Sequence, residues 1–331
     1  MSRIKTVVLI SGGLDSALAA KILIDLGVDV FGIHFVLPWG CGDKPRSVNI
    51  AEQLKIPLKI IQLDEDFLDI VKKPQHGYGS AINPCVDCRI YNLKKAKKYM
   101  EEIGADFVAT GEILGQRPMS QMRRSLKSVE IGSGLENRLL RPLCAKLLDP
   151  TDAEKQGKID REKLHNFSGR SRSGLQKMGE NLDIKNYTPT GGGCLLTDRN
   201  FARRIKDSFK HGYKNLDEII SLRWGRHFRI NEHFKVIVGR DEFENKKLIE
   251  HAENDDFIFE LKDFEGPTAI LKGKNPKNKE FLIAANLVRR YSKYRTNANL
   301  VLSFWNSCEP NNIQEVQSTE ISEEILSKLF I

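Results

Sequence analysis

The stretch Arg3-Ile4-Lys5-Thr6-Val7-Val8-Leu9-Ile10-Ser11-Gly12-Gly13-Leu14-Asp15-Ser16 decides how the chain begins to fold. Its apolar run ending at Ile10 predicts a buried strand, the paired glycines predict a tight turn, and the periodic segment 17–23 predicts a helix. Glycines let backbone N–H groups approach an anion closely, and a helix N-terminus carries partial positive charge. We therefore expect Ser11, Gly12, Gly13, Asp15 and Ser16 to form a phosphate-binding loop.

Length and composition limit the classes of protein to which this chain can belong. The chain has 331 residues, enough for two domains, and 40% of them are hydrophobic. Charged residues interrupt every apolar stretch, so we expect a cytoplasmic protein without a membrane span. Six cysteines are too few for a disulfide scaffold in a chain of this length. The formal net charge of +8 favours a polyanionic partner.

Predicted strands and helices alternate up to about residue 200. Strands are expected at 28–36, 58–63 and 105–110, which indicates an α/β fold with a doubly wound, mostly parallel, Rossmann-like sheet. Ligands of such sheets bind at the carboxyl edge of the strands. His34 and Phe35 at the end of the second strand are candidates to contact adenine, although His34 could equally be a half-buried strand residue. Gly111 and Gln116 follow a later strand and are candidates for the same site.

A different pattern begins near residue 201. We predict a helical connector over 201–225, a smaller α+β domain over 226–300 and a C-terminal tail over 301–331. The segment 272–295 has eight basic residues, a single acidic one and two interleaved tyrosines, Tyr291 and Tyr294. Such a one-sided cluster with aromatic residues is typical of contact with an RNA backbone.

Three cysteines stand in unusual surroundings. Cys85 and Cys88 form a CxxC pair at the start of a basic helix, and Cys194 follows three consecutive glycines. Thiolates bind iron and zinc, but structural zinc usually takes four protein ligands, and a second CxxC or paired histidines are absent from the sequence. Asp87, between the first two cysteines, could transfer a proton or cap the helix.

Four motifs together resemble one family. SGGLDS at 11–16, NPCVDC at 83–88, the ATG at 109–111 and GGGCLLTD at 191–198 are similar to motifs of the PP-loop ATP pyrophosphatases that thiolate tRNA, the 2-thiouridine and 4-thiouridine synthases. The resemblance covers roughly residues 1–200. VGRDEFEN at 238–245, GPTAIL at 266–271 and RRYSKYR at 289–295 resemble the NFACT-type RNA-binding domain.

The resemblance implies a set of cofactors and partners. ATP would bind the Ser11–Ser16 loop with Mg²⁺, for which Asp15 is the expected ligand. Cys85, Cys88 and Cys194 would bind a [4Fe–4S] cluster with one open iron for sulfide. A persulfide on these cysteines and a structural zinc ion are the alternatives. The partners would be tRNA and either sulfide or a sulfur-donor protein such as a cysteine desulfurase.

The implied reaction is adenylation of a uridine carbonyl oxygen, release of pyrophosphate, and replacement of AMP by sulfur. The target base would leave its stack and rest on an aromatic side chain such as Tyr78 or Trp39. Three other functions fit the same motifs. They are a small-molecule PP-loop ligase, an ATP-gated RNA-binding or sulfur-carrier protein, and an enzyme that removes sulfur from RNA.

Overall fold

The computed structural model describes residues 3–37, 39, 44–187, 193–213 and 215–331. It divides the chain into two compact units, Met1–Thr197 and Asp198–Ile331, each with its own sheet and core. In the described part of the chain no helix is both long and apolar enough to cross a bilayer.

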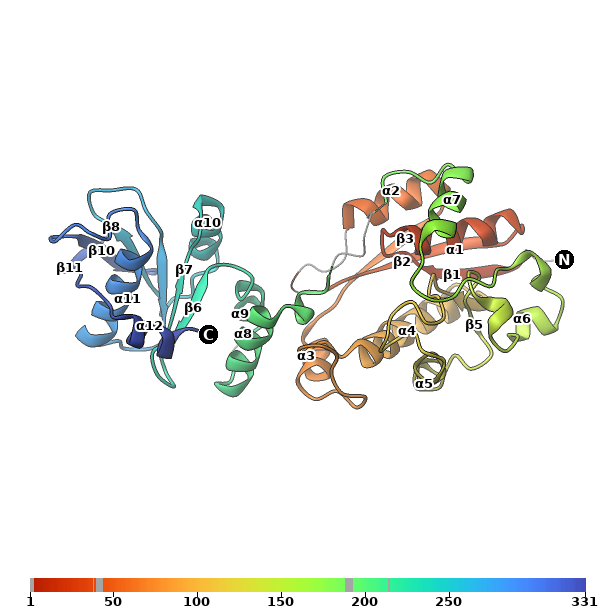
Figure 1. Ribbon diagram of the computed structural model, residues 1–331, viewed down its shortest axis with the longest axis horizontal. Coiled ribbons are helices and arrows are strands. Elements are labelled where there is room, and N and C mark those ends of the chain that lie inside the picture. Colours follow the sequence, from red (N-terminus) through yellow and green to blue (C-terminus); the bar gives the residue numbers. More distant parts are fainter. Residues whose placement is uncertain (1–2, 38, 40–43, 188–192, 214) are drawn as a thin grey trace. The chain divides into compact units, whose positions relative to one another are not determined.

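The first unit contains a five-stranded sheet in which every neighbouring pair is parallel (Figure 1). The strand order is β3-β2-β1-β4-β5. This confirms the predicted doubly wound sheet. The order reverses beside β1, which places the loop after β1 at the position where such sheets bind ligands. The strands are β1 Lys5–Leu9, β2 Asp29–Val36, β3 Leu58–Gln62, β4 Phe107–Ala109 and β5 Leu139–Leu140.

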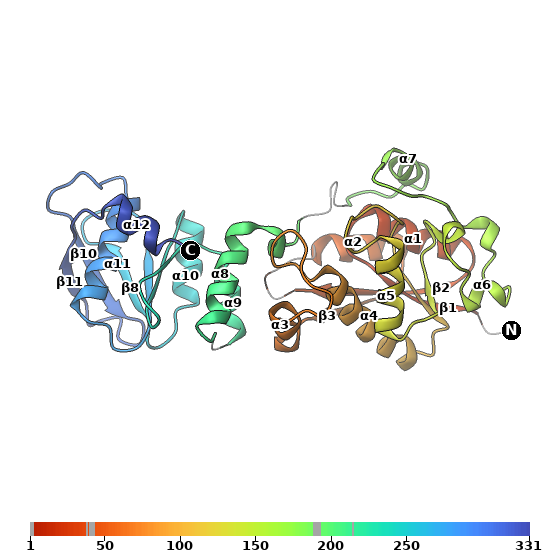
Figure 2. The same cartoon turned by 60° about the horizontal axis from the view of Figure 1, so that its bottom comes forward.

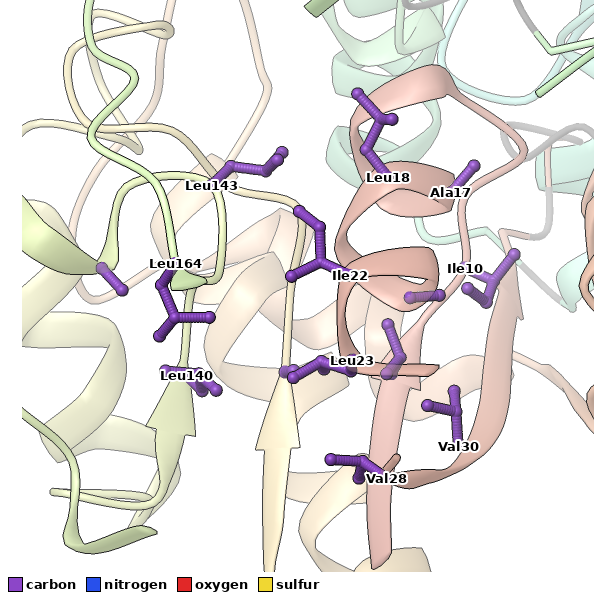
Figure 3. Close-up of a cluster of buried hydrophobic side chains, with 14 of the residues drawn as sticks. Ile10, Ala17, Leu18, Ile22, Leu23, Val28, Val30, Leu140, Leu143 and Leu164 are labelled. Atoms are coloured by element: carbon purple, nitrogen blue, oxygen red, sulfur yellow. The ribbon is translucent and has the colours of Figure 1, made fainter. Parts of the chain in front are cut away.

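Helices cover both faces of this sheet (Figures 1 and 2). The alternation of β1 explains the two layers: Val8 packs with α1 on one face, and Val7 and Leu9 pack with α4 on the other. Figure 3 shows Ile22 and Leu23 of α1 within the first of these cores. One layer holds α1 Leu14–Asp25, α2 Lys44–Leu54 and α7 Ser173–Asn181; the other holds α3 Glu65–Lys72, α4 Cys85–Glu102 and α5 Arg123–Ser133, and the short α6 is Asp152–Lys155.

The second unit contains a six-stranded antiparallel sheet of order β11-β10-β8-β9-β7-β6. Val236 and Val238 of β7 face α11, whereas Ile237 between them faces α10, so helices cover both faces of this sheet as well. The strands are β6 Arg226–Arg229, β7 Lys235–Val238, β8 Phe257–Leu261, β9 Ala269–Lys272, β10 Val301–Asn306 and β11 Gln314–Gln317. The helices are α8 Arg199–Lys210, α9 Leu216–Ser221, α10 Glu242–Glu250, α11 Asn278–Tyr291 and α12 Glu323–Leu329.

The predicted boundaries of the second unit need correction. Residues 301–331 are not a tail, because β10 pairs along β8 and its Leu302 and Phe304 are buried in the core. Residues 201–225 are not a separate connector, since α8 and α9 fall within the second unit. In α8, Asp207 accepts hydrogen bonds from Arg229 of β6 at 2.6 and 3.2 Å. The C-terminal segment is largely polar, so its sequence did not indicate β10, in which buried residues alternate with less buried ones.

Candidate nucleotide and sulfur site

The loop between β1 and α1 is organised by the hydroxyl of Ser16. This hydroxyl donates to the carbonyl oxygen of Gly13 at 2.8 Å and accepts from the backbone N–H of Ser11 at 3.2 Å. Gly12 has φ +81°, a left-handed conformation that favours glycine. Gly13 is the N-cap of α1 and has no side chain to satisfy the first N–H groups of the helix. The loop therefore presents donors at a helix N-terminus, as an anion-binding loop requires.

Gly111 brings a second loop against the first. A Cβ atom at this position would lie 2.4 Å from the carbonyl carbon and oxygen of Asp15 and 2.6 Å from the nitrogen of Ser16. No side chain fits such a gap without moving backbone. The loop after β4 and the first turn of α1 can therefore meet only through glycine.

Two polar side chains from distant segments hold the carboxylate of Asp15. Gln116 donates to one oxygen at 3.0 Å and Arg172 donates to the other at 3.3 Å. The sequence predicted Asp15 and Gln116 for this site but not Arg172, because a basic loop 157 residues away gives no sequence signal of its destination. The rule that ligands bind at the carboxyl edge of such a sheet does not identify Arg172 either.

A pocket of about 90 Å³ connects the phosphate loop to the CxxC helix. Ser11, Asp15 and Ser16 line one side of it, and Arg89 of α4 also contributes to the lining. Arg89 directly follows Cys88 in the chain, so the first turn of α1 and the second turn of α4 line one pocket. The remaining lining residues are Leu9, Thr110, Gly111, Glu112, Gln116, Arg117 and Gln121.

Buried charges hold two of the side chains that line this pocket, Glu112 and Arg89. Glu112, which is 2% exposed, accepts a hydrogen bond from Arg141 at 3.1 Å and lies 3.4 Å from the Nε of Arg89. Burial alone would raise the pKa of Glu112, but the charges of Arg141 and Arg89 outweigh it and lower that pKa. Arg141 is held in turn by Glu130 and by the carbonyl oxygen of Leu126. Glu112 therefore stays ionised and orients Arg89.

Cys85 and Cys88 lie in the first turn of α4, as predicted. The side-chain amide of Asn83 donates to the Sγ of Cys85 at 3.1 Å, and that of Asn92 approaches the Sγ of Cys88 at 3.9 Å. None of the five described cysteines forms a disulfide. Cys41 lies outside the described residues.

Cys194 belongs to a segment that meets the chain just before the CxxC pair. The N–H of Ile82 donates to the carbonyl oxygen of Leu196 at 3.1 Å. Cys194 accepts two hydrogen bonds from Thr197 through its own carbonyl oxygen, at 2.7 and 2.8 Å. Within the described residues, no three His, Cys, Asp or Glu side chains form a group that could hold a metal ion. The backbone thus brings residues 82 and 196 together, while the three thiols are not gathered as ligands.

Other predicted site residues have structural partners. Asp87 accepts hydrogen bonds from the backbone of Gln75 and His76 and from the ring of His76, so it anchors a preceding loop and does not cap its own helix. His34 is 2% exposed, and its Nδ1 lies 2.7 Å from the carbonyl oxygen of Ile10. Phe35 is partly buried against the core on the α4 face.

The two aromatic residues proposed to stack a base differ. Trp39 is fully buried and packs on Phe67 with ring centroids 5.7 Å apart, so it is wrong as a stacking platform. Tyr78 is 38% exposed, and its hydroxyl donates to the carbonyl oxygens of Val71 and Lys72. Burial raises the pKa of Tyr78.

Family models match both units. The model described as the thiamine biosynthesis protein ThiI matches residues 2–152, and the model described as the NFACT protein RNA-binding domain matches residues 225–330. Each unit is thus similar to a different family. Below, residues 1–197 are called the PP-loop domain and residues 198–331 the NFACT-type domain.

Two curated relatives of this chain carry the same description. A tRNA-specific 2-thiouridylase of Syntrophotalea carbinolica is 34% identical over 31% of this chain and 33% of its own length. The enzyme of the same description from Listeria monocytogenes is 25% identical over 62% of this chain and 56% of its own length. The chain thus spans a third to just over half of these relatives.

Two solved structures share low overall similarity with the chain. The U34-tRNA thiolase NcsA of Methanococcus maripaludis with its [4Fe–4S] cluster has 18% identity and a TM-score of 0.34, covering 67% of this chain and 72% of that one. A 4-thiouridine synthetase in complex with RNA and ATP has 24% identity and a TM-score of 0.35, covering 54% of this chain and 51% of that one.

The basic segment 272–295 of the NFACT-type domain is less one-sided in space than in sequence. Lys272 pairs with Asp256 at 2.7 Å, Arg290 pairs with Glu323, and Arg289 is 5% exposed and donates to backbone carbonyl oxygens. Tyr294 stacks on Phe264 with ring centroids 4.2 Å apart. Much of the segment therefore stabilises the domain. Lys279 and Lys293 are exposed, and neither forms an ion pair within the described part of the chain.

Proposed function

We propose that this chain is a tRNA uridine sulfurtransferase that activates its substrate with ATP. The observation that supports this most directly is the shared pocket, in which the phosphate loop and Arg89, the neighbour of Cys88, line one space. Activation of an oxygen and attack by sulfur must occur at the same carbon atom, so the two groups of residues have to face one volume. The curated relatives are described as tRNA-specific 2-thiouridylases, which agrees with the proposal.

In the first half of the proposed reaction, a carbonyl oxygen of uracil attacks the α-phosphorus of ATP. A bond from that oxygen to phosphorus forms, the bond to the bridging oxygen breaks, and pyrophosphate leaves with the electron pair. The Ser11–Ser16 loop would hold the phosphates, and Asp15 would bind Mg²⁺. Most of the acceleration would come from positioning and from neutralising charge on the leaving group.

In the second half, sulfide attacks the activated carbon and AMP leaves with the former carbonyl oxygen. Arg89 would stabilise the negative charge of the departing phosphate, because its guanidinium is held at the pocket by Glu112. Cys85, Cys88 and Cys194 suit a [4Fe–4S] cluster in kind and number. When bound, such a cluster supplies an open iron that holds sulfide.

A persulfide on the same cysteines is the second candidate for the sulfur source. It needs no set of three ligands, which agrees with the finding that the described side chains form no metal-binding group. Iron analysis of protein purified without oxygen, together with its absorbance near 400 nm, distinguishes the two sources. Activity that survives complete removal of iron favours the persulfide.

The test of the proposed function is an ATP-dependent assay on unmodified tRNA, read by mass spectrometry of the nucleosides and by pyrophosphate release. Cys194→Ala should bind nucleotide normally and give no thionucleoside. Cys308→Ala is the matched control, since Cys308 is exposed in the other domain and should not matter. Normal thionucleoside from Cys194→Ala removes its role in sulfur transfer. Pyrophosphate release without thionucleoside from the unmodified chain overturns the sulfurtransferase assignment.

A further inference from the structure

We propose that Arg172 binds the β- and γ-phosphates of ATP and stabilises the departing pyrophosphate. This inference rests on the proposed function, because it assumes that ATP occupies the Ser11–Ser16 loop. It adds a ligand from a segment outside the SGGLDS motif, located on the loop that leads into α7. Four observations support this proposal. Helix α7 packs on α1, and the loop before α7 is bonded to the loop after β4. Arg172 contacts Asp15, and most of the N–H donors of its guanidinium have no partner in the contacts described below.

Helix α7 is docked directly on the helix that carries the phosphate loop. Leu175 is 1% exposed and belongs to the same core as Leu14 and Leu18 of α1. At Gly179, a Cβ atom would lie 2.7 Å from a Cδ of Leu14, so the two helices approach closely there. Leu14 is the first residue of α1. The start of α1 and the body of α7 therefore form one packed unit.

The loop before α7 is also held at its other end. The N–H of Gly169 donates to the carbonyl oxygen of Leu114 at 2.8 Å, and Ser168 forms an isolated parallel bridge with Leu114. Leu114 lies two residues before Gln116, which donates to Asp15. Fixed on both sides, the loop delivers Arg172 to the carboxylate of Asp15.

The guanidinium of Arg172 uses little of its hydrogen-bonding capacity at this position. Its Nη2 donates to Asp15 at 3.3 Å, and its buried Nε has no hydrogen-bond partner among the described residues. A guanidinium carries five N–H donors in a plane and can bind phosphate through two of them at once. A side chain that is 29% exposed, beside an anion-binding loop, can offer those donors to a ligand.

Charge explains why an arginine is needed beside Asp15. ATP would bring several negative charges close to this carboxylate, which by itself would repel them. Mg²⁺ bound to Asp15 would remove part of that repulsion and compete with Arg172 for the carboxylate. We infer that Arg172 then turns from Asp15 to the phosphates. Negative charge grows on the leaving pyrophosphate in the transition state, so a cation there would favour reaction as well as binding.

Calorimetric titration of the full chain with α,β-methylene ATP and with AMP, both with Mg²⁺, tests the inference. Arg172→Ala should weaken binding of the ATP analogue by about 10- to 100-fold, as expected for loss of a charged hydrogen-bonding partner. Binding of AMP should change much less, since AMP lacks the two outer phosphates. Arg170→Ala removes the same charge from an exposed position in the same loop and should leave both affinities unchanged.

A double variant separates direct phosphate binding from a role in orienting Asp15. If Arg172 binds phosphate, Arg172→Ala should still weaken binding of the analogue in an Asp15→Asn background. If the loss disappears in that background, or if AMP and the analogue weaken equally, the inference is overturned while the proposed function stands. An unmodified chain that binds neither nucleotide overturns both. Thermal unfolding of each variant, unchanged from the unmodified chain, confirms that the fold is intact.

Discussion

The two domains each bury a cluster of charges but use it differently. In the PP-loop domain, Glu112 bonds to Arg141 and faces Arg89, which lines the pocket. In the NFACT-type domain, Asp207 of α8 bonds to Arg229 and lies 3.8 Å from Lys235. The first cluster lies beside the pocket and orients the Arg89 side chain that lines it. The second fastens a helix to a sheet, and its charges serve the fold.

The clusters also differ in whether they can lose their charge. Burial would lower the pKa of Arg141, but Glu112 and Glu130 outweigh it and raise that pKa, so this guanidinium stays charged. Burial lowers the pKa of Lys235 to about 7, although Asp207 opposes the shift. A lysine can relieve its own desolvation by releasing a proton, whereas an arginine cannot. The PP-loop domain is therefore more dependent on its carboxylate.

The largest expected effect comes from a substitution at Gly111, where the loop after β4 meets the first turn of α1. Gly111→Ala places a methyl group 2.4 Å from the backbone of Asp15, which must displace the first turn of α1. We expect binding of an ATP analogue to fall by at least about 100-fold, the size of effect that a misplaced binding group produces. Calorimetric titration measures the loss, and the NFACT-type domain should unfold as before.

Gly132→Ala is the matched control for that substitution. The added methyl group at Gly132, next to the last residue of α5, meets side-chain atoms of Ile90, with Cδ1 2.7 Å away, and none of the three nearest atoms belongs to the backbone. Alanine also favours a helix over glycine. Nucleotide affinity that falls equally in both variants would contradict the account of Gly111.

Removing each carboxylate tests the comparison of the two clusters. Glu112→Ala removes one of the two carboxylates that pair with the buried Arg141, leaving Glu130, and should lower the free energy of unfolding of the PP-loop domain by about 3–5 kcal/mol. Asp207→Ala should cost the NFACT-type domain less, about 1–3 kcal/mol, because Lys235 can become neutral. Differential scanning calorimetry of the full chain resolves the two transitions. A larger loss for Asp207→Ala than for Glu112→Ala contradicts the comparison.

The titration of Lys235 should also appear in how the free energy of unfolding of the NFACT-type domain depends on pH. Between pH 7 and pH 10.5 Lys235 holds its proton in the unfolded chain but not in the folded one, since its pKa falls from 10.5 to about 7 on folding. The free energy of unfolding of the NFACT-type domain should therefore rise with pH across this window. Urea unfolding at pH 7, 8 and 9, followed by the fluorescence of Trp224 and Trp305, measures it.

Lys235→Met removes the titrating group and should flatten the rise of the free energy of unfolding with pH. A slope in Lys235→Met equal to that of the unmodified chain is the contrary result.

The free energy of unfolding of the PP-loop domain should change in the opposite direction at higher pH. Burial raises the pKa of the Cys144 thiol from 9.0 to about 11, so the folded chain keeps a proton that the unfolded chain loses between these values. The stability of the PP-loop domain should therefore fall from pH 9 to pH 11.

The smallest expected effect concerns RNA. Lys279→Ala with Lys293→Ala removes two exposed charges from the basic segment and should weaken tRNA binding a few-fold, lowering the salt-dependence slope by about 1–2. Lys246→Ala with Lys262→Ala is the control, because these exposed lysines are paired with Glu242 and Glu315. Electrophoretic mobility at several salt concentrations measures both. Equal losses in the two double variants would show that net charge alone governs binding.

Local patterns in the sequence predicted most of the first domain. Strand, glycine turn and helix at Val7–Leu23 form as expected, because short-range periodicity and backbone freedom decide them. The arrival of Arg172 at Asp15 could not be predicted, since it depends on how α7 packs on α1 across 157 residues. The role of Asp87 was missed for a related reason: its partners, Gln75 and His76, lie in a loop without periodicity. In the second domain the eight basic residues suggested an open surface, while the acidic partners of Lys272, Lys274 and Arg290 lie elsewhere in the chain.

The hydrogen bond between Ile82 and Leu196 has a consequence for synthesis. A ribosome makes the phosphate loop, Cys85 and Cys88 long before it makes Cys194, and domains fold as their residues emerge. The strands and helices around the phosphate loop can thus assemble while Cys194 is still untranslated. A product that stops before residue 194 would hold the phosphate loop and its parallel sheet without the segment that meets Ile82.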